Sequence, residues 1–127
     1  MNKSGGTRIG GLLLLAALMI AGLSDTGFAA SRTKGKTILW VDSYQSGYAW
    51  SDSIERGIKS VLDGSSNRLV IHRMDTKNCR SRECMVEAGE NAHRVIQDIR
   101  PDILIASDDN AQKYLVVPYI KDSGLPT

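Results

Sequence analysis

Three apolar runs of this chain end abruptly in polar residues. They span residues 37–43, 69–74 and 103–106 and are rich in Ile, Leu and Val, without the alternation of a half-exposed strand. Continuous runs of this kind are typical of parallel strands that helices cover on both faces. His72 and Arg73 interrupt the second run, which favours an edge position for that strand. The pattern therefore predicts three parallel strands.

Helical periodicity fills the stretches between and after these runs. Apolar side chains recur there every three or four positions, which predicts helices over residues 51–63, 81–99 and 111–117. Gly64 ends the first helix, and Pro118 ends or disturbs the third.

Two pairs of residues have the spacing of a capping box at a helix start. Asp52 is followed three positions later by Glu55, and Asp109 is followed by Gln112. Ser51 is a good capping residue as well. We therefore expect the first helix to begin at Ser51 or Asp52 and the third to begin just after Asp109.

The order strand, helix, strand, helix, strand, helix predicts an α/β fold with a parallel sheet flanked by helices. Right-handed crossovers and the polar second strand favour the sheet order 2-1-3, in which the first and third strands are neighbours. The loops after Ser43 and Ser107 then lie side by side, where the chain reverses direction across the sheet. Ligands of open α/β sheets bind at this carboxyl edge.

Both loops carry side chains suited to a small solute. Rings after the first strand cover flat or apolar surface, while carboxylate, amide and helix N–H groups after the third fix polar atoms. Two simpler interpretations stay open: helix capping by one aspartate, and packing of the aromatic loop against its own helix. Trp40 lies within its strand and is assigned to the core. The predicted ligand-binding residues are Ser43, Tyr44, Tyr48, Trp50, Asp108, Asp109 and Asn110.

The first 29 residues differ from the rest of the chain. Lys3 and Arg8 precede a short apolar segment at residues 12–23, and small residues stand at positions 27 and 29. This is typical of a secretory signal peptide, because the apolar run is shorter than the roughly 20 residues of a spanning helix. The alternative is an uncleaved N-terminal anchor. In either case residues 30–36 are expected to form a flexible lead and residues 37–127 an exported lobe.

Composition and charge exclude several classes of function. The chain is 42% hydrophobic and 24% charged, as in ordinary globular proteins. Its formal charge of +2 becomes +1 when Lys3, Arg8 and Asp25 leave with the signal peptide. There is no basic stripe with interleaved aromatic residues, so we expect no nucleic-acid partner. Export disfavours ATP-dependent chemistry, and no cofactor is expected.

Cys79 and Cys84 are the only cysteines. A disulfide between them requires Cys79 to lie before the second helix, because five positions within a helix are too far for a bridge; the alternative is two free thiols. No histidine stands near them at ligand spacing, so no metal site is expected. His72 and His93 are too scattered for a Ser-His-Asp or Cys-His arrangement, and no catalytic residue is expected.

An enzyme-like alternative is the receiver domain of a response regulator, in which carboxylates at strand ends hold magnesium and accept a phosphoryl group. Residues 38–42 and 101–107 resemble its first and third strands. However, Ser43 follows Asp42 where a second acid is expected, Ser107 precedes the later acids, and export removes the domain from its kinase. These departures favour a binding protein.

Five segments of the chain resemble the periplasmic substrate-binding proteins of a family of bacterial ABC transporters. They are residues 38–44, 47–51, 74–77, 106–111 and 113–119, and the last two, in register, are the most specific. The resemblance covers essentially the whole mature chain and implies a type I periplasmic-binding fold, in which two α/β lobes joined by a hinge close on a solute. This chain then corresponds to the first part of lobe I.

The resemblance also implies a function. It is that of a periplasmic protein that binds a small solute, such as an amino acid, and delivers it to an ABC transporter permease in the inner membrane. Some relatives carry the same module on sensor proteins, so a periplasmic sensor module of a signalling protein is the alternative. Both functions need differential affinity between open and closed states and no bond chemistry, so we expect no enzymatic activity.

Overall fold

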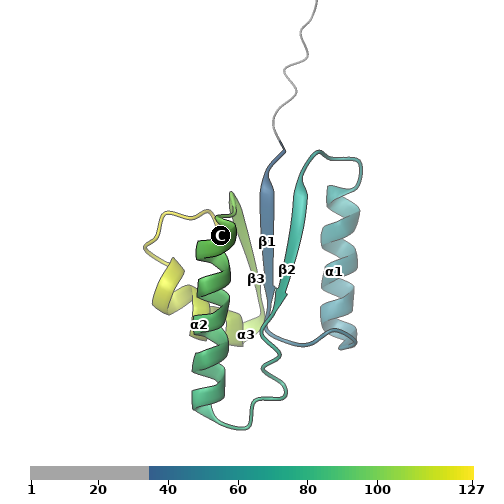
Figure 1. The fold of residues 1–127 in the computed structure, drawn as a ribbon. Coiled ribbons are helices and arrows are strands. Elements are labelled where there is room, and N and C mark those ends of the chain that lie inside the picture. Colours follow the sequence, from purple (N-terminus) through teal and green to yellow (C-terminus); the bar gives the residue numbers. More distant parts are fainter. Residues whose placement is uncertain (1–34) are drawn as a thin grey trace, which may run out of the picture. The chain divides into compact units, whose positions relative to one another are not determined.

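A three-stranded parallel sheet forms the centre of the computed structural model, which describes residues 35–127. The strands are β1 (Thr37–Asp42), β2 (Arg68–Arg73) and β3 (Ile103–Ser107). Their order is β2-β1-β3, which confirms the predicted 2-1-3 sheet with the polar second strand at an edge (Figure 1). The predicted signal peptide and most of the lead lie outside the described residues.

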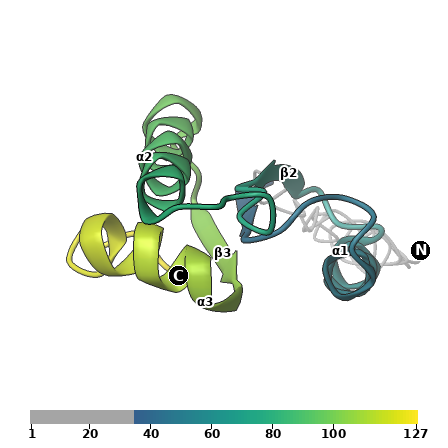
Figure 2. The same cartoon turned by 90° about the horizontal axis from the view of Figure 1, so that it is seen from below.

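Helices cover both faces of this sheet, as the continuous apolar strands require. Figures 1 and 2 show α1 (Ala49–Leu62) on one side, and α2 (Arg82–Ile99) with the C-terminal helices on the other. The C-terminal helices are α3 (Asp108–Ala111) and the π-helix η1 (Gln112–Ile120). None of the helices in the described range has the length and apolar character needed to cross a membrane.

The main core lies between the sheet, α2 and η1. Leu39, Val41 and Leu104 alternate toward this side, and α2 and η1 contribute buried apolar residues of their own. Gly89 of α2 lies so close to η1 that an added Cβ would stand 2.1 Å from the carbonyl oxygen of Tyr114. A glycine is therefore needed for this close helix approach. The other buried members of the cluster are Met74, Ala92, Ile96, Ala111, Leu115 and Ile120.

The predicted start of the first helix is wrong by a few residues. α1 begins at Ala49 and its N-cap is Tyr48, whose side chain makes no capping bond. Asp52 does not cap the first turn, because its Oδ1 accepts a hydrogen bond from the backbone amide of Gly47 at 3.1 Å. Gly47 has φ +84°, a conformation that glycine adopts readily, and forms a tight turn ahead of the helix. The bond from its amide to Asp52 holds this turn in place. Trp50 consequently lies in the first turn of α1, not in a loop.

The predicted start of the third helix is also wrong. α3 begins at Asp108, directly after β3, and its N-cap Ser107 makes no side-chain capping bond. Asp109 accepts from the amide of Asn110, and the side chain of Gln112 donates to the carbonyl of Ala106 at 3.3 Å. The capping box expected from Asp109 and Gln112 is therefore not formed, because both side chains have other partners.

Pro118 was expected to end or disturb this helix, and it disturbs the helix without ending it. It lies inside η1, which continues to Ile120. In an α-helix its ring would clash with the carbonyl four residues earlier, and the wider π turn relieves that crowding. The amide of Lys121 bonds the carbonyl of Val116, five residues back, at 2.9 Å. Leu115 and Ile120 are both buried, so packing against the core stabilises the wider helix.

α2 matches its predicted range, and its start explains the cysteines. Ser81 is the N-cap, and its side chain accepts a hydrogen bond from the amide of Cys84 at 3.3 Å. Cys79 therefore precedes the helix, as a bridge requires, and it forms a disulfide with Cys84 at a Cα–Cα distance of 5.5 Å. The disulfide closes the end of the loop that connects β2 to α2.

Candidate functional site

The loops that follow β1 and β2 are joined to each other and to α3, which directly follows β3, at the carboxyl edge of the sheet. The carbonyl of Ser43 accepts bonds from the amide and hydroxyl of Thr76, at 2.9 and 2.7 Å. The hydroxyl of Ser43 donates to the carbonyl of Ser107 at 2.7 Å and accepts from the amide of Ala111 at 2.8 Å. Asn110 adds a bond to Thr76 at 2.9 Å. Two loops and the junction of β3 with α3 are thus held together around one buried serine.

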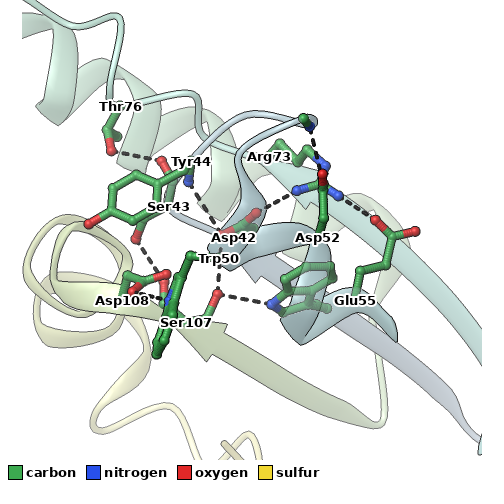
Figure 3. A network of polar contacts seen from close by, with 12 residues as sticks. Asp42, Ser43, Tyr44, Trp50, Asp52, Glu55, Arg73, Thr76, Ser107 and Asp108 are labelled. Atoms are coloured by element: carbon green, nitrogen blue, oxygen red, sulfur yellow. Dashed lines mark hydrogen bonds and ion pairs between the residues drawn. The ribbon is translucent and has the colours of Figure 1, made fainter. Parts of the chain in front are cut away.

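A charged network lies beneath these loops (Figure 3). Asp42 is fully buried at the end of β1 and pairs with Arg73 of β2, which also pairs with Glu55 of α1. Ser107 links this network to β3, because its hydroxyl donates to Asp42 at 3.3 Å and accepts from the indole of Trp40 at 3.1 Å. The network connects α1 to all three strands. The hydrogen bond from Lys59, helped by the charges of Lys59 and Arg73, lowers the pKa of the Glu55 carboxyl, while burial opposes the shift.

The exposed edge above this network carries two contacts between aromatic and acidic residues. The hydroxyl of Tyr44 donates to Asp109 at 3.2 Å, and the indole of Trp50 donates to Asp108 at 3.0 Å. Tyr48 stacks edge-on against Tyr44, with ring centroids 5.2 Å apart. Trp50 is 59% exposed, so its ring faces solvent although its indole N–H is bonded. The loops after β1 and β3 therefore form one continuous surface.

A lysine from the third loop lies on this surface. The ammonium of Lys77 is 4.4 Å from the ring centroid of Tyr44 and 5.2 Å from that of Tyr48. Both distances are within the range of a cation–π interaction. We call the surface the rim and define it by six residues: Tyr44, Tyr48, Trp50, Lys77, Asp108 and Asp109.

Two features of Asp108 are unfavourable: its backbone conformation and the surroundings of its carboxylate. Its backbone has φ +70°, a left-handed conformation that non-glycine residues rarely adopt. Its Oδ2 is buried and has no hydrogen-bond partner within residues 35–127. Burial raises the pKa of this carboxyl above its ordinary value, and the nearby acids Asp42 and Asp109 add to the effect, while the bond from Trp50 opposes it. Unsatisfied polar atoms and strained backbone of this kind cluster at functional sites.

Tyr44 is held in its neutral form. Burial, followed by the charge and hydrogen bond of Asp109, raises the pKa of its hydroxyl from 10.0 to about 12. The hydroxyl therefore keeps its proton at neutral pH and serves as a donor to Asp109.

The structure places most of the predicted ligand-binding residues together. Tyr44, Tyr48, Trp50, Asp108 and Asp109 all lie on the rim. Ser43 and Asn110 lie at the same edge but below it: Ser43 has no exposed surface, and the side-chain amide of Asn110 is bonded to Thr76. Both residues help to position these segments; Ser43 does not reach the exposed surface, whereas Asn110 is partly exposed.

Sequence reasoning missed the contribution of the second loop. Thr76 ties the loops together, Lys77 covers the rings and Arg73 pairs with Asp42. A topological rule could have found them, because parallel strands all end at the same edge, so the residues after β2 must reach it too. The interruption of the apolar run at Arg73 was the local signal.

The rim is an open surface and not a cavity. One hollow, of about 450 Å³, lies between the β2–α2 loop and α2, where Met74, Asn78 and Arg94 are part of its lining. Another, of about 320 Å³, lies between α1 and Ile105. Neither is lined by a rim residue, so a ligand at the rim would need a second surface to enclose it. Within residues 35–127 no three His, Cys, Asp or Glu side chains group as metal ligands.

Comparisons of this chain with protein-family models, with curated proteins and with solved structures found no match. The geometry of the rim is therefore the basis on which a function can be assigned.

Proposed function

We propose that residues 37–127 are the first part of a ligand-binding lobe in an extracytoplasmic solute-binding protein of the ABC transporter type, and that the rim contacts the solute. The protein binds the solute without bond chemistry and delivers it to a membrane permease. One observation carries this proposal: loops 65 residues apart meet through the contact of Tyr44 with Asp109, beside that of Trp50 with Asp108.

The position of the rim supports a binding role. β1 and β3 are adjacent in the β2-β1-β3 sheet, and the helices that follow them, α1 and α3, lie on opposite sides of it (Figures 1 and 2). Open α/β sheets hold their ligands at the carboxyl ends of two such neighbouring strands. The aromatic and acidic residues of the rim come from the loops that border that point.

The open form of the rim supports a lobe that works with another. A small solute is usually buried over most of its surface, which an open edge by itself does not provide. A second lobe that closes over the rim would supply the missing surface, as the resemblance to periplasmic-binding proteins implies. A sensor module would use the same rim and differ in its partner, a signalling protein in place of a permease.

The state of Asp42 favours binding over phosphoryl transfer. A phosphoacceptor site needs strand-end carboxylates that can reach a magnesium ion. Both oxygens of Asp42 already accept bonds from the chain itself: one from Ser107 and the amide of Tyr44, the other from Arg73. Asp42 is also fully buried. Its chemistry is that of a structural carboxylate.

Two substitutions in the full-length protein test the proposal. A solute is first identified by thermal-shift screening of small solutes, including amino acids, and its affinity is then measured by calorimetry. Trp50→Ala and Asp108→Ala are each expected to weaken binding about thirtyfold, the usual effect of losing a central aromatic or charged contact.

Matched controls lie away from the rim. Val61→Ala removes an exposed apolar side chain of α1, and Asp98→Ala removes an exposed carboxylate of α2. Both controls should leave the affinity unchanged. Full affinity in both rim variants would show that the solute binds elsewhere, and the proposal would then be wrong.

A further inference from the structure

The rim already holds a cation, supplied by the chain itself. The Lys77 ammonium lies 4.4 and 5.2 Å from the ring centroids of Tyr44 and Tyr48. The two rings are 5.2 Å apart and inclined by 77°, so they form two walls of one corner. Aromatic faces attract positive charge within about 6 Å of their centroids. The corner is therefore built in a way that favours a cation.

Negative charge lies next to this corner. Asp109 accepts the hydroxyl proton of Tyr44, and Asp108 accepts the indole proton of Trp50. The Oδ2 atom of Asp108 has no hydrogen-bond partner in the described part of the chain. A positively charged N–H donor would satisfy both the rings and this carboxylate, and a compact quaternary ammonium would satisfy the rings and offset the negative charge without a hydrogen bond. An anion would meet two carboxylates instead.

The Lys77 side chain can leave the corner without unfolding the loop. Its backbone is held between Thr76, which bonds Ser43, and Asn78, which bonds Asp75. Lys77 itself is exposed, and the described residues offer its ammonium no carboxylate at ion-pair distance. A lysine has a flexible four-carbon stem, so its ammonium can swing into water while the backbone stays in place.

We propose that the solute of this rim carries a positively charged amine, which displaces the Lys77 ammonium from the corner formed by Tyr44, Tyr48 and Asp108. This inference rests on the proposed function and adds the chemical class of the ligand. Lys77 then acts as an internal competitor that occupies the site in the absence of solute.

Choline tests whether positive charge is needed for binding. Its neutral counterpart, 3,3-dimethylbutan-1-ol, has the same shape and no charge. In the full-length protein, NMR shifts of the Trp50 indole and the Tyr44 ring are followed during titration with each. Choline is expected to shift both signals with saturation, whereas the neutral alcohol at equal concentration leaves them in place. Equal binding of the two probes would overturn the proposal.

Removing the competitor tests the role of Lys77. Lys77→Met is expected to bind choline several-fold to about tenfold more tightly, because no ammonium has to be displaced. Lys113→Met is the matched control, since Lys113 also lies over a tyrosine ring, that of Tyr114 at 5.1 Å, but away from the rim. It loses the same charge and should bind choline as the unmodified protein does. Unchanged or weaker binding in Lys77→Met would contradict the proposal.

The solute identified by screening separates the two proposals. A cationic solute whose affinity falls in Trp50→Ala supports both. A neutral or anionic solute with the same dependence on Trp50 overturns the cation assignment and leaves the proposed function standing. A solute whose affinity is unchanged in Trp50→Ala overturns both proposals.

Discussion

Asp42 ends β1 and Asp108 directly follows the neighbouring strand β3, yet the two carboxylates are in opposite states. Asp42 is fully buried, and its oxygens accept bonds from Arg73, Ser107 and the Tyr44 amide. Asp108 has φ +70°, one bond from Trp50 and a buried oxygen without a hydrogen-bond partner in residues 35–127. The first carboxylate holds the edge together, and the second keeps a buried oxygen that no described residue satisfies.

The difference shows how a small α/β fold can tolerate a strained group. A residue held in a left-handed conformation costs on the order of 1–3 kcal/mol and persists only where its surroundings fix it. Here Ser43 and Thr76 bind the loops on either side of the rim. The satisfied network therefore stabilises the edge on which the unsatisfied carboxylate stands.

The largest expected effect comes from breaking the satisfied network. Arg73→Met removes the cation that pairs with Asp42, and a buried carboxylate without its partner is strongly destabilising. The free energy of unfolding should fall by about 3 kcal/mol, measured by urea denaturation of the full-length protein.

Arg94→Met, on the exposed surface of α2, is the control for that substitution. It should change the free energy of unfolding by no more than about 0.5 kcal/mol. If Arg73→Met were equally mild, Asp42 would not depend on its ion pair and the contrast with Asp108 would be lost.

A smaller effect is expected from opening the loop that carries Lys77. Replacing Cys79 and Cys84 together by serine removes the disulfide, and the chain-entropy model gives a loss of about 2 kcal/mol for so short a loop. Amide hydrogen exchange should accelerate over residues 75–81 and stay unchanged in β1. Uniform acceleration across the sheet would mean that the disulfide supports the whole fold and not the rim.

The smallest effect, and one of opposite sign, is expected from Asp108→Asn. Burial raises the pKa of Asp108 above its value of 3.8 in the unfolded chain. Its contribution to stability is therefore fully present below pH 3.8 and is lost as the pH rises through the higher pKa of the folded state. Asparagine cannot ionise, and its oxygen can still accept the bond from Trp50.

Thermal unfolding at a series of pH values measures this effect. The Asp108→Asn variant should be more stable than the unmodified protein at neutral pH, and the advantage should vanish at acidic pH, below 3.8. Asp98→Asn on α2 should show no such pH dependence. A neutral-pH loss of stability in Asp108→Asn would mean that the carboxylate is satisfied after all.

The sequence alone determined the strands, the order of the sheet and the edge at which the site lies. Buried parallel strands need continuous apolar runs, and the handedness of crossovers restricts how such strands are ordered. Both rules act through local composition and chain connectivity, which a sequence contains. They correctly placed the segment that carries Tyr44 and Trp50 beside the one that carries Asp108 and Asp109.

Tertiary structure decided where the helices begin and end. It also decided the position of Lys77, which the loop after β2 contributes to the rim. Asp52 bonds Gly47 instead of capping α1, and Pro118 is retained inside η1 because burial of Leu115 and Ile120 stabilises the wider helix. Lys77 has no local pattern that marks it, since its position over two rings depends on contacts across three loops. Capping and helix-breaking preferences amount to only a few kcal/mol, so long-range packing can override them.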